Sequence, residues 1–225
     1  MKFTNKKVII FDLDGTLIDS SPDLALAINH MLNSIGKDTF SLDEIHHWVG
    51  NGAQTLVKRA LSGSVEISVN IEQKEFEHAL NIFLKFYAQN LAIKTETYPH
   101  VLSTLAKLKA QGYKLVIVTN KPFDFVEPIL KELKLKKYFE FHLGGDSLNE
   151  KKPNPAPLLY VADKLNVSVE QCIMIGDSKN DILAAQACNM QSIGLTYGYN
   201  YGEHISTYNP DVYTSDFSEI AKLLC

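Results

Sequence analysis

The sequence predicts an α/β protein, namely a doubly wound, Rossmann-like parallel sheet with an inserted α-helical cap domain. Short, continuous apolar runs alternate with helical patterns, and such runs are typical of parallel strands that are buried on both faces. The first and second runs are about 100 residues apart, whereas a crossover connection needs about a dozen or more. We expect this long interval to hold the cap. The predicted strands are residues 8–11, 115–118, 172–175 and 192–195.

The same patterns predict the helices of the core. A helix is expected over residues 99–110, and Gly112 follows it where a glycine commonly ends a helix. The C-terminal stretch 211–225 predicts a short edge strand and a closing helix. The other helices expected in the core are residues 123–133, 156–165 and 181–188.

The inserted segment has helical patterns along almost all of its length. Ser21-Pro22-Asp23 combines a cap, a first-turn proline and an acid near the positive end of a helix that Gly36 would end. Ser41 to Glu44 is a capping box that opens a second helix. Further helical patterns cover residues 53–61 and 76–91, and the second of these has one apolar face. The predicted core domain is residues 1–17 and 95–225, and the predicted helical cap domain is residues 18–94.

Composition excludes several classes of function. The chain has 225 residues, 45% of them hydrophobic, and a formal net charge of −4, so a broad nucleic-acid surface is not expected. No apolar run approaches the roughly 20 residues of a membrane span, and the run 8–11 is too short for a signal peptide. Three cysteines, Cys172, Cys188 and Cys225, form no CxxC pair. These features predict a reduced, cytoplasmic protein with no membrane partner.

The first candidate site follows the first predicted strand. Asp12 and Asp14 point to the same side of the chain, and Gly15 allows a sharp turn after them. Open α/β sheets bind ligands beyond the carboxyl ends of their strands. Two carboxylates at this position repel each other and favour a bound cation or a shared proton. A solvated turn or a calcium site would have the same short pattern.

Three later segments add polar groups that could reach the same sheet edge. Thr119 follows a predicted strand, and its hydroxyl could donate to a phosphate oxygen or simply end the strand. Lys152 precedes a predicted helix, where it could hold an anion or lie in a solvated loop. Asp177 ends another strand, and Asp181 lies in a pattern that would also cap the following helix.

Together these segments predict a metal site. Four carboxylates at one rim are strongly unfavourable without a cation, and oxygen ligands without histidine or cysteine favour Mg²⁺. Lys152 and Mg²⁺ would together neutralise a phosphate group. A small-molecule phosphoester is therefore the expected substrate.

The combination of these four motifs, in this order, resembles the haloacid dehalogenase superfamily of phosphohydrolases. The resemblance covers essentially the whole chain. It implies that Asp12 is a nucleophile that forms an aspartyl phosphate. It also implies that Asp14 is first the acid for the leaving group and then the base that activates water. Thr119 and Lys152 would hold the phosphoryl oxygens.

The resemblance also implies the metal ligands and the role of the insert. Mg²⁺ would be bound by Asp12, by the backbone carbonyl of Asp14 and by Asp177. Asp181 would contact the groups that bind the metal, or it would bind the metal through a water molecule. The helical insert would close over the core and exclude water.

Longer segments resemble the bacterial branch of this superfamily that hydrolyses 2-phosphoglycolate. That substrate carries a carboxylate, which needs a cation or a group of backbone N–H donors. Gly50, Asn51 and Gly52 could supply the N–H donors. Arg59 or Lys121 could supply the cation. Thr16 and Asn120 are further candidates for substrate binding. The segments that carry the resemblance are residues 12–20, 22–24, 49–52, 118–122, 152–155, 176–182 and 194–200.

Other functions fit the same motifs. A related phosphatase of a sugar phosphate or of pyrophosphate is the main alternative, followed by a phosphomutase that resembles β-phosphoglucomutase. A receiver-like phosphorylation switch also places acids, a threonine and a lysine at strand ends, but receivers are about half this length. A metal-free dehalogenase fits poorly with the acids at positions 14, 177 and 181. The sequence leaves open whether the chain is a monomer or a homodimer.

Overall fold

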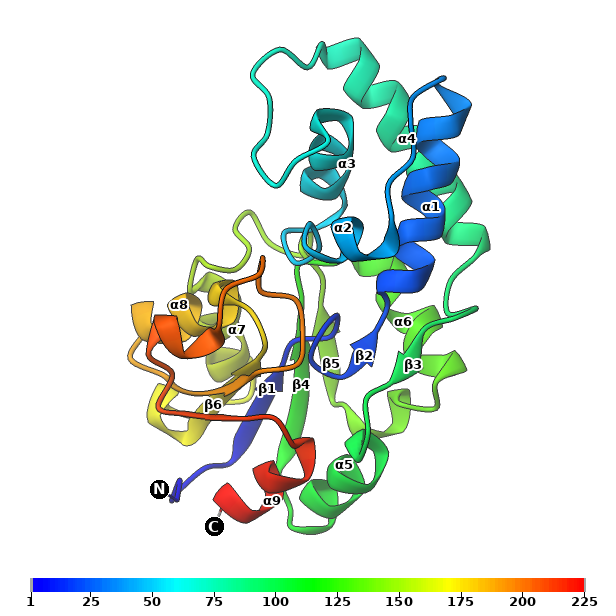
Figure 1. The fold of residues 1–225 in the computed structure, drawn as a ribbon. Coiled ribbons are helices and arrows are strands. Elements are labelled where there is room, and N and C mark those ends of the chain that lie inside the picture. The colour runs from blue at the N-terminus through cyan, green and yellow to red at the C-terminus, as the bar shows by residue number, and fades with distance from the viewer. Residues whose placement is uncertain (1, 225) are drawn as a thin grey trace.

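The computed structural model describes residues 2–224 and contains a six-stranded parallel sheet in the order β5-β4-β1-β6-β7-β8 (Figure 1). This arrangement confirms the predicted doubly wound α/β core. The short edge strand β5 was not predicted, because it has only three residues and is only partly buried. The strands are β1 (Val8–Phe11), β4 (Lys114–Val118), β5 (Phe141–Leu143), β6 (Cys172–Gly176), β7 (Gln191–Leu195) and β8 (Val212–Thr214).

The sheet is buried on both faces, which explains the continuous apolar runs in the sequence. In β1, Ile9 and Phe11 belong to one hydrophobic cluster, whereas Val8 and Ile10 belong to another. Strand residues alternate between the two faces, so a strand between two helical layers must be apolar at every position. Figure 1 shows α7 and α8 on one side of the sheet and α5 and α6 on the other.

The core helices begin and end within two residues of their predicted bounds. They are α5 (Val101–Ala110), α6 (Phe123–Glu132), α7 (Ala156–Lys164) and α8 (Lys179–Ala187), with α9 (Ile220–Leu223) closing the chain. Short 3-10 turns cover Lys136–Tyr138, Val169–Gln171, Ile205–Tyr208 and Phe217–Glu219. Cys225 and Met1 lie outside the described residues.

The inserted segment is attached to the core by a small antiparallel ladder. β2 (Ile18–Asp19) pairs with β3 (Glu96–Thr97), so the chain enters and leaves the insert at neighbouring points. Both strands were missed because two residues give no measurable periodicity. They lie within two residues of the predicted domain boundaries, which remain a prediction. Between them are α1 (Ser21–Ser34), α2 (Leu42–His46), α3 (Ala53–Ser62) and α4 (Gln73–Gln89).

Asp23 fastens the first cap helix to the segment that leaves the cap. Its carboxylate accepts hydrogen bonds from the backbone N–H groups of Lys94 and Thr95 and from the Thr95 hydroxyl, at 2.6–3.0 Å. The side chain is 1% exposed. The sequence predicts Asp23 only as an acid near a helix end. In the structure it also joins this helix to a segment about 70 positions later in the chain.

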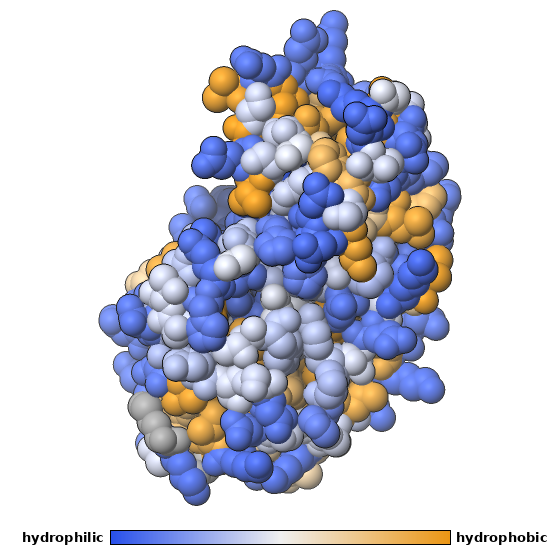
Figure 2. Space-filling model, in the orientation of Figure 1, coloured by the Kyte–Doolittle hydropathy of each residue, from blue (hydrophilic) through white to orange (hydrophobic). Residues whose placement is uncertain are grey.

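The molecular surface is mixed in character. Figure 2 shows hydrophilic side chains over much of the visible face and apolar groups gathered on the cap, near the loop between α3 and α4. Val65, Ile67 and Val69 in that loop are exposed. Among residues 2–224, no helix has the length and apolar character that a membrane crossing requires.

Candidate active site

The carboxyl ends of the three central strands bring the predicted residues together. β1 lies between β4 and β6, and Phe11 is in register with Ile117 and with Ile175. Asp12 directly follows Phe11, while Thr119 and Asp177 come two residues after Ile117 and Ile175, respectively. All three side chains therefore lie at one edge of the sheet. The strand order therefore determines the composition of the site.

Lys152 connects two of the acids. Its ammonium lies 3.1 Å from Oδ1 of Asp12 and 2.6 Å from Oδ1 of Asp181. The Lys152 side chain is 1% exposed, although lysine is rarely fully buried without partners. Burial opposes its charge, but the carboxylates of Asp12 and Asp181 raise the pKa of Lys152 above its usual value. Lys152 is therefore a fixed positive charge at the floor of the site.

Two neighbouring groups hold Asp177 in place. The Thr16 hydroxyl donates to Oδ1 at 2.5 Å, and the backbone N–H of Tyr199 donates to Oδ2 at 2.6 Å. Asp181 is held in turn by a capping box, in which its Oδ2 accepts from the N–H and hydroxyl of Ser178. Capping thus fixes Asp181 beside the site.

Asp12, Asp177 and Asp181 form a buried acidic cluster. Each offers a carboxylate oxygen, and these oxygens lie within 4.8 Å of one another. Burial, with the neighbouring carboxylates, raises the pKa of Asp12 to about 7 despite the opposing Lys152, and raises that of Asp177 well above its usual range. Three acids against one ammonium leave an excess of negative charge, so the cluster fits a divalent cation with oxygen ligands.

Asp14 is directed into a separate polar contact. Its carboxylate lies 2.9 Å from the Lys121 ammonium and accepts from the Ser20 hydroxyl at 2.6 Å. Burial alone lowers the pKa of Lys121, but the Asp14 carboxylate reverses this effect and raises it. Asp14 and Asp12 thus have different partners, which suits two different chemical roles.

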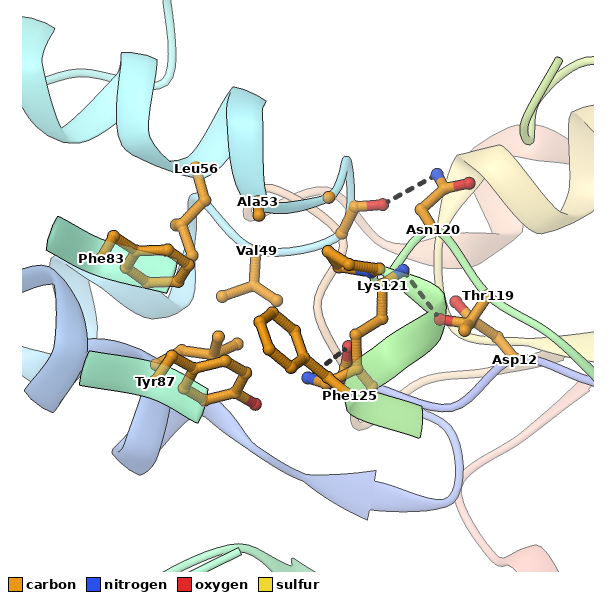
Figure 3. A pocket seen from close by; sticks show the side chains of 15 residues that line it. Asp12, Val49, Ala53, Leu56, Phe83, Tyr87, Thr119, Asn120, Lys121 and Phe125 are labelled. Atoms are coloured by element: carbon orange, nitrogen blue, oxygen red, sulfur yellow. Dashed lines mark hydrogen bonds and ion pairs between the residues drawn. The ribbon is translucent and has the colours of Figure 1, made fainter. Parts of the chain in front are cut away.

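A cleft extends from these residues toward the cap. Its cavity volume is about 30 Å³. Figure 3 shows Asp12 and Thr119 at one end and Phe83 and Tyr87 at the other. The polar end comes from the core, whereas most of the far wall is apolar and consists of Leu24, Val49, Ala53, Leu56, Phe83 and Phe125.

Comparison with known proteins identifies the family. The model of the haloacid dehalogenase-like hydrolases matches residues 9–195. The chain belongs to this family. The match covers every motif that follows a strand of the site, from Asp12 to Asp181.

Several relatives of this hydrolase are named for one activity. The phosphoglycolate phosphatase of Colwellia psychrerythraea is 54% identical over 220 residues, covering 98% of this chain and 97% of that protein. The phosphoglycolate phosphatase of Psychrobacter arcticus is 51% identical, with 98% and 96% covered. A crystal structure described as a predicted phosphoglycolate phosphatase from Haemophilus somnus has a TM-score of 0.92 at 42% identity, with 97% of this chain and 98% of that chain covered.

The hydrolase cleft brings together some of the predicted substrate-binding residues and not others. Thr119, Asn120 and Lys121 line it, as do Gly50 and Gly52 of the cap. Thr16 is buried against Asp177 instead. The roles of all these residues in binding remain predictions.

Arg59 has contacts that differ from those expected of a substrate-binding cation. Its guanidinium donates to the backbone carbonyls of Trp48 at 2.7 Å and of Val65 at 3.0 Å, and it stacks over the Tyr201 ring at 5.0 Å. Arg59 is 9% exposed and does not line the cleft. Within the cleft, Lys121 is the cation that faces the substrate space.

The cap and the core of the hydrolase are joined at Gly50. Its carbonyl accepts from the side-chain amide of Asn120 at 3.1 Å and from that of Asn180 at 3.2 Å. Lys151 donates to the carbonyl of Asn51 at 2.9 Å. Asn180 was not expected in this role, because an asparagine in the first turn of a helix gives no signal of a contact 130 residues away.

Sequence reasoning also missed the functional side of the long cap helix. The pattern of residues 76–91 predicts one apolar face, and Tyr87 belongs to that face. It lines the cleft and is 1% exposed. In the sequence, Tyr87 differs from the phenylalanines on the same helix face only by its hydroxyl. Periodicity alone does not distinguish a ring that packs in the core from one that contacts a ligand.

Proposed function

We propose that this hydrolase is a phosphoglycolate phosphatase, which converts 2-phosphoglycolate and water to glycolate and phosphate. The observation that carries the proposal is the composition of the cleft. One end suits a phosphate, and Lys121 is the additional cation for a carboxylate. The apolar far wall offers few hydrogen-bonding groups to the hydroxyls of a sugar. The names of the relatives that are 54% and 51% identical support the same substrate.

In the first step, Asp12 is the nucleophile. Its carboxylate attacks phosphorus, the bond between phosphorus and the ester oxygen breaks, and an aspartyl phosphate forms. Lys152 and Thr119 bind the phosphoryl oxygens, whose negative charge is spread in the transition state. The ammonium 3.1 Å from Asp12 supports this role for Lys152.

Asp14 is the general acid and base. It donates a proton to the departing glycolate oxygen and then removes one from the water that hydrolyses the aspartyl phosphate. The contacts to Ser20 and Lys121 keep its carboxylate beside the cleft. In this arrangement the carboxylate of the substrate shares the Lys121 ammonium with Asp14.

The acidic cluster supports a role for Mg²⁺, which hydrolases of this family generally use. Asp12, Asp177 and the backbone carbonyl of Asp14 would hold the ion. Asp181 would contact these ligands or bind the ion through a water molecule. When bound, the ion supplies positive charge against the phosphoryl oxygens and the nucleophile.

The helical segment of residues 18–94 forms a cap over a core of residues 1–17 and 95–225. Its closure would keep bulk water from the aspartyl phosphate until the hydrolytic water is in place. The contacts of Gly50 with Asn120 and Asn180 support such a closed arrangement.

The two described cysteines are free, which supports a cytoplasmic location. A monomer or a homodimer would suffice for this chemistry.

The test is phosphate release, with and without Mg²⁺, from 2-phosphoglycolate, several sugar phosphates, pyrophosphate and a bisphosphorylated sugar. We expect kcat/KM for 2-phosphoglycolate to exceed the others by at least ~100-fold, or about 2.7 kcal/mol of transition-state discrimination. A flat profile that depends on Mg²⁺ would keep the reaction type and reject the substrate. Activation by the bisphosphate would indicate a phosphomutase instead.

A further inference from the structure

Tyr87 occupies a fixed position in the wall of the cleft. It lies in α4, and its ring stacks on Phe83 with centroids 5.7 Å apart. The edge contact with Phe125 has a centroid distance of 5.2 Å. Two aromatic neighbours and 1% exposure leave the ring little freedom, so the direction of its hydroxyl is determined by packing.

The Tyr87 hydroxyl is an unusual group for this wall. It is buried, and within residues 2–224 its proton has no acceptor, because the neighbouring Lys121 ammonium can only donate. A buried hydroxyl whose proton has no acceptor is unfavourable, and phenylalanine would fill the same space at no such cost. Burial raises the pKa of Tyr87 to about 12, so the group remains a donor at neutral pH. A polar ligand atom in the cleft would supply the missing acceptor.

The hydroxyl lies beside the cation of the cleft. The Lys121 ammonium is 4.9 Å from the centroid of the Tyr87 ring, and Figure 3 shows the hydroxyl directed toward the Lys121 side chain. The Lys121 side chain is 3% exposed and its ammonium is paired with Asp14. An ammonium and an O–H donor thus share one corner of an otherwise apolar wall, an arrangement suited to the two oxygens of a carboxylate.

We propose that Tyr87 determines substrate specificity by donating a hydrogen bond to the carboxylate of the leaving group, beside Lys121. This inference rests on the proposed function and adds a cap residue to it. Because Tyr87 comes from the cap and Asp12 from the core, the carboxylate and the phosphate of one substrate would bridge the two. A substrate without a carboxylate leaves the Tyr87 hydroxyl unpaired, so this hydroxyl does not raise kcat/KM for such a substrate.

The experiment compares Tyr87→Phe with the wild type on 2-phosphoglycolate and on ethyl phosphate, which has the same carbon chain and no carboxylate. For 2-phosphoglycolate we expect kcat/KM to fall by about 10- to 100-fold, as for loss of a hydrogen bond to a charged group. For ethyl phosphate it should change by less than about threefold. The melting temperature should stay equal or rise, because the variant removes an unpaired buried hydroxyl.

Leu56→Val is the matched control, because Leu56 lies in the same apolar wall but on α3, and its replacement removes no donor. It should change kcat/KM for both substrates by a similar factor. If Tyr87→Phe retains the wild-type preference for 2-phosphoglycolate, or slows both substrates equally, the role of Tyr87 is overturned while the proposed function stands. If the wild type itself shows no preference for 2-phosphoglycolate, the proposed function fails and this inference fails with it.

Discussion

The Lys121 ammonium and the Asp14 carboxylate form an ion pair at 2.9 Å, with 3% and 12% of their side chains exposed. The pair joins the proposed acid–base group to the proposed cation for the substrate. The ion pair therefore connects two motifs of the site that lie 107 residues apart in the sequence.

Replacing Asp14 by asparagine should slow turnover of 2-phosphoglycolate by about 10²- to 10⁴-fold, the usual contribution of general acid–base catalysis. It should also lower the free energy of unfolding by up to about 3 kcal/mol, because the buried Lys121 loses its carboxylate. Steady-state kinetics and chemical denaturation would measure the two effects. Adding Lys121→Met should restore stability without restoring activity. Full activity in Asp14→Asn would refute the acid–base role.

Asp12→Asn should abolish phosphate release, with kcat at least ~10³-fold lower, because an amide cannot form the acyl phosphate. The protein should stay folded, since Lys152 keeps its contact of 2.6 Å with Asp181 and the acidic cluster loses one charge. Rapid-quench detection of labelled protein would reveal the aspartyl phosphate in the wild type and none in the variant. Loss of cooperative melting would instead make Asp12 a structural residue.

Mg²⁺ should stabilise the fold more at about pH 8 than at about pH 5. Without metal, burial raises the pKa of Asp12 from 3.8 to about 7 and that of Asp177 well above 3.8. The folded state then binds more protons than the unfolded state over roughly pH 4–7, so this contribution to stability is lost as pH rises through that window. Metal binding replaces these protons. Thermal melting with Mg²⁺ and with a chelator tests this, and an equal shift at both pH values would contradict it.

Gly52→Ala should separate the cap from the core. Gly52 has a φ of +85°, and a Cβ built there would lie 2.7 Å from the backbone oxygen of Asn120. We expect kcat/KM to fall at least ~10-fold, because the cap no longer seats on the site. Gly112→Ala is the control, because Gly112 has a φ of +89° and open space around the added atom. Equal effects of the two substitutions on activity would show that backbone strain, and not the contact with the core, is responsible.

Arg59→Met should mainly affect stability. The variant removes the hydrogen bonds to the carbonyls of Trp48 and Val65, so we expect a loss of about 1–3 kcal/mol in the free energy of unfolding. The ratio of kcat/KM for 2-phosphoglycolate to that for ethyl phosphate should stay within about threefold of the wild type. A selective loss on 2-phosphoglycolate would restore Arg59 as the cation for the carboxylate.

The α/β core could be predicted because its signals are local and strong. The apolar run of β1 and the helix patterns of α5 and α7 each span several residues, and burial on both faces leaves no polar position in the strand. The elements that were missed, β2, β3 and β5, have two or three residues each. Their existence depends on pairing with distant segments and not on their own sequence.

The site was predictable in part for the same reason. Asp12, Thr119 and Asp177 follow strands, so the sequence by itself determined which side chains stand at the active edge. Only the tertiary structure decided how these and the remaining groups are paired. It placed Lys152 between Asp12 and Asp181, paired Lys121 with Asp14 and brought the Tyr87 ring beside the Lys121 ammonium. Such pairings join residues up to 140 positions apart in the sequence, as Asp12 and Lys152 are, and no local pattern encodes them.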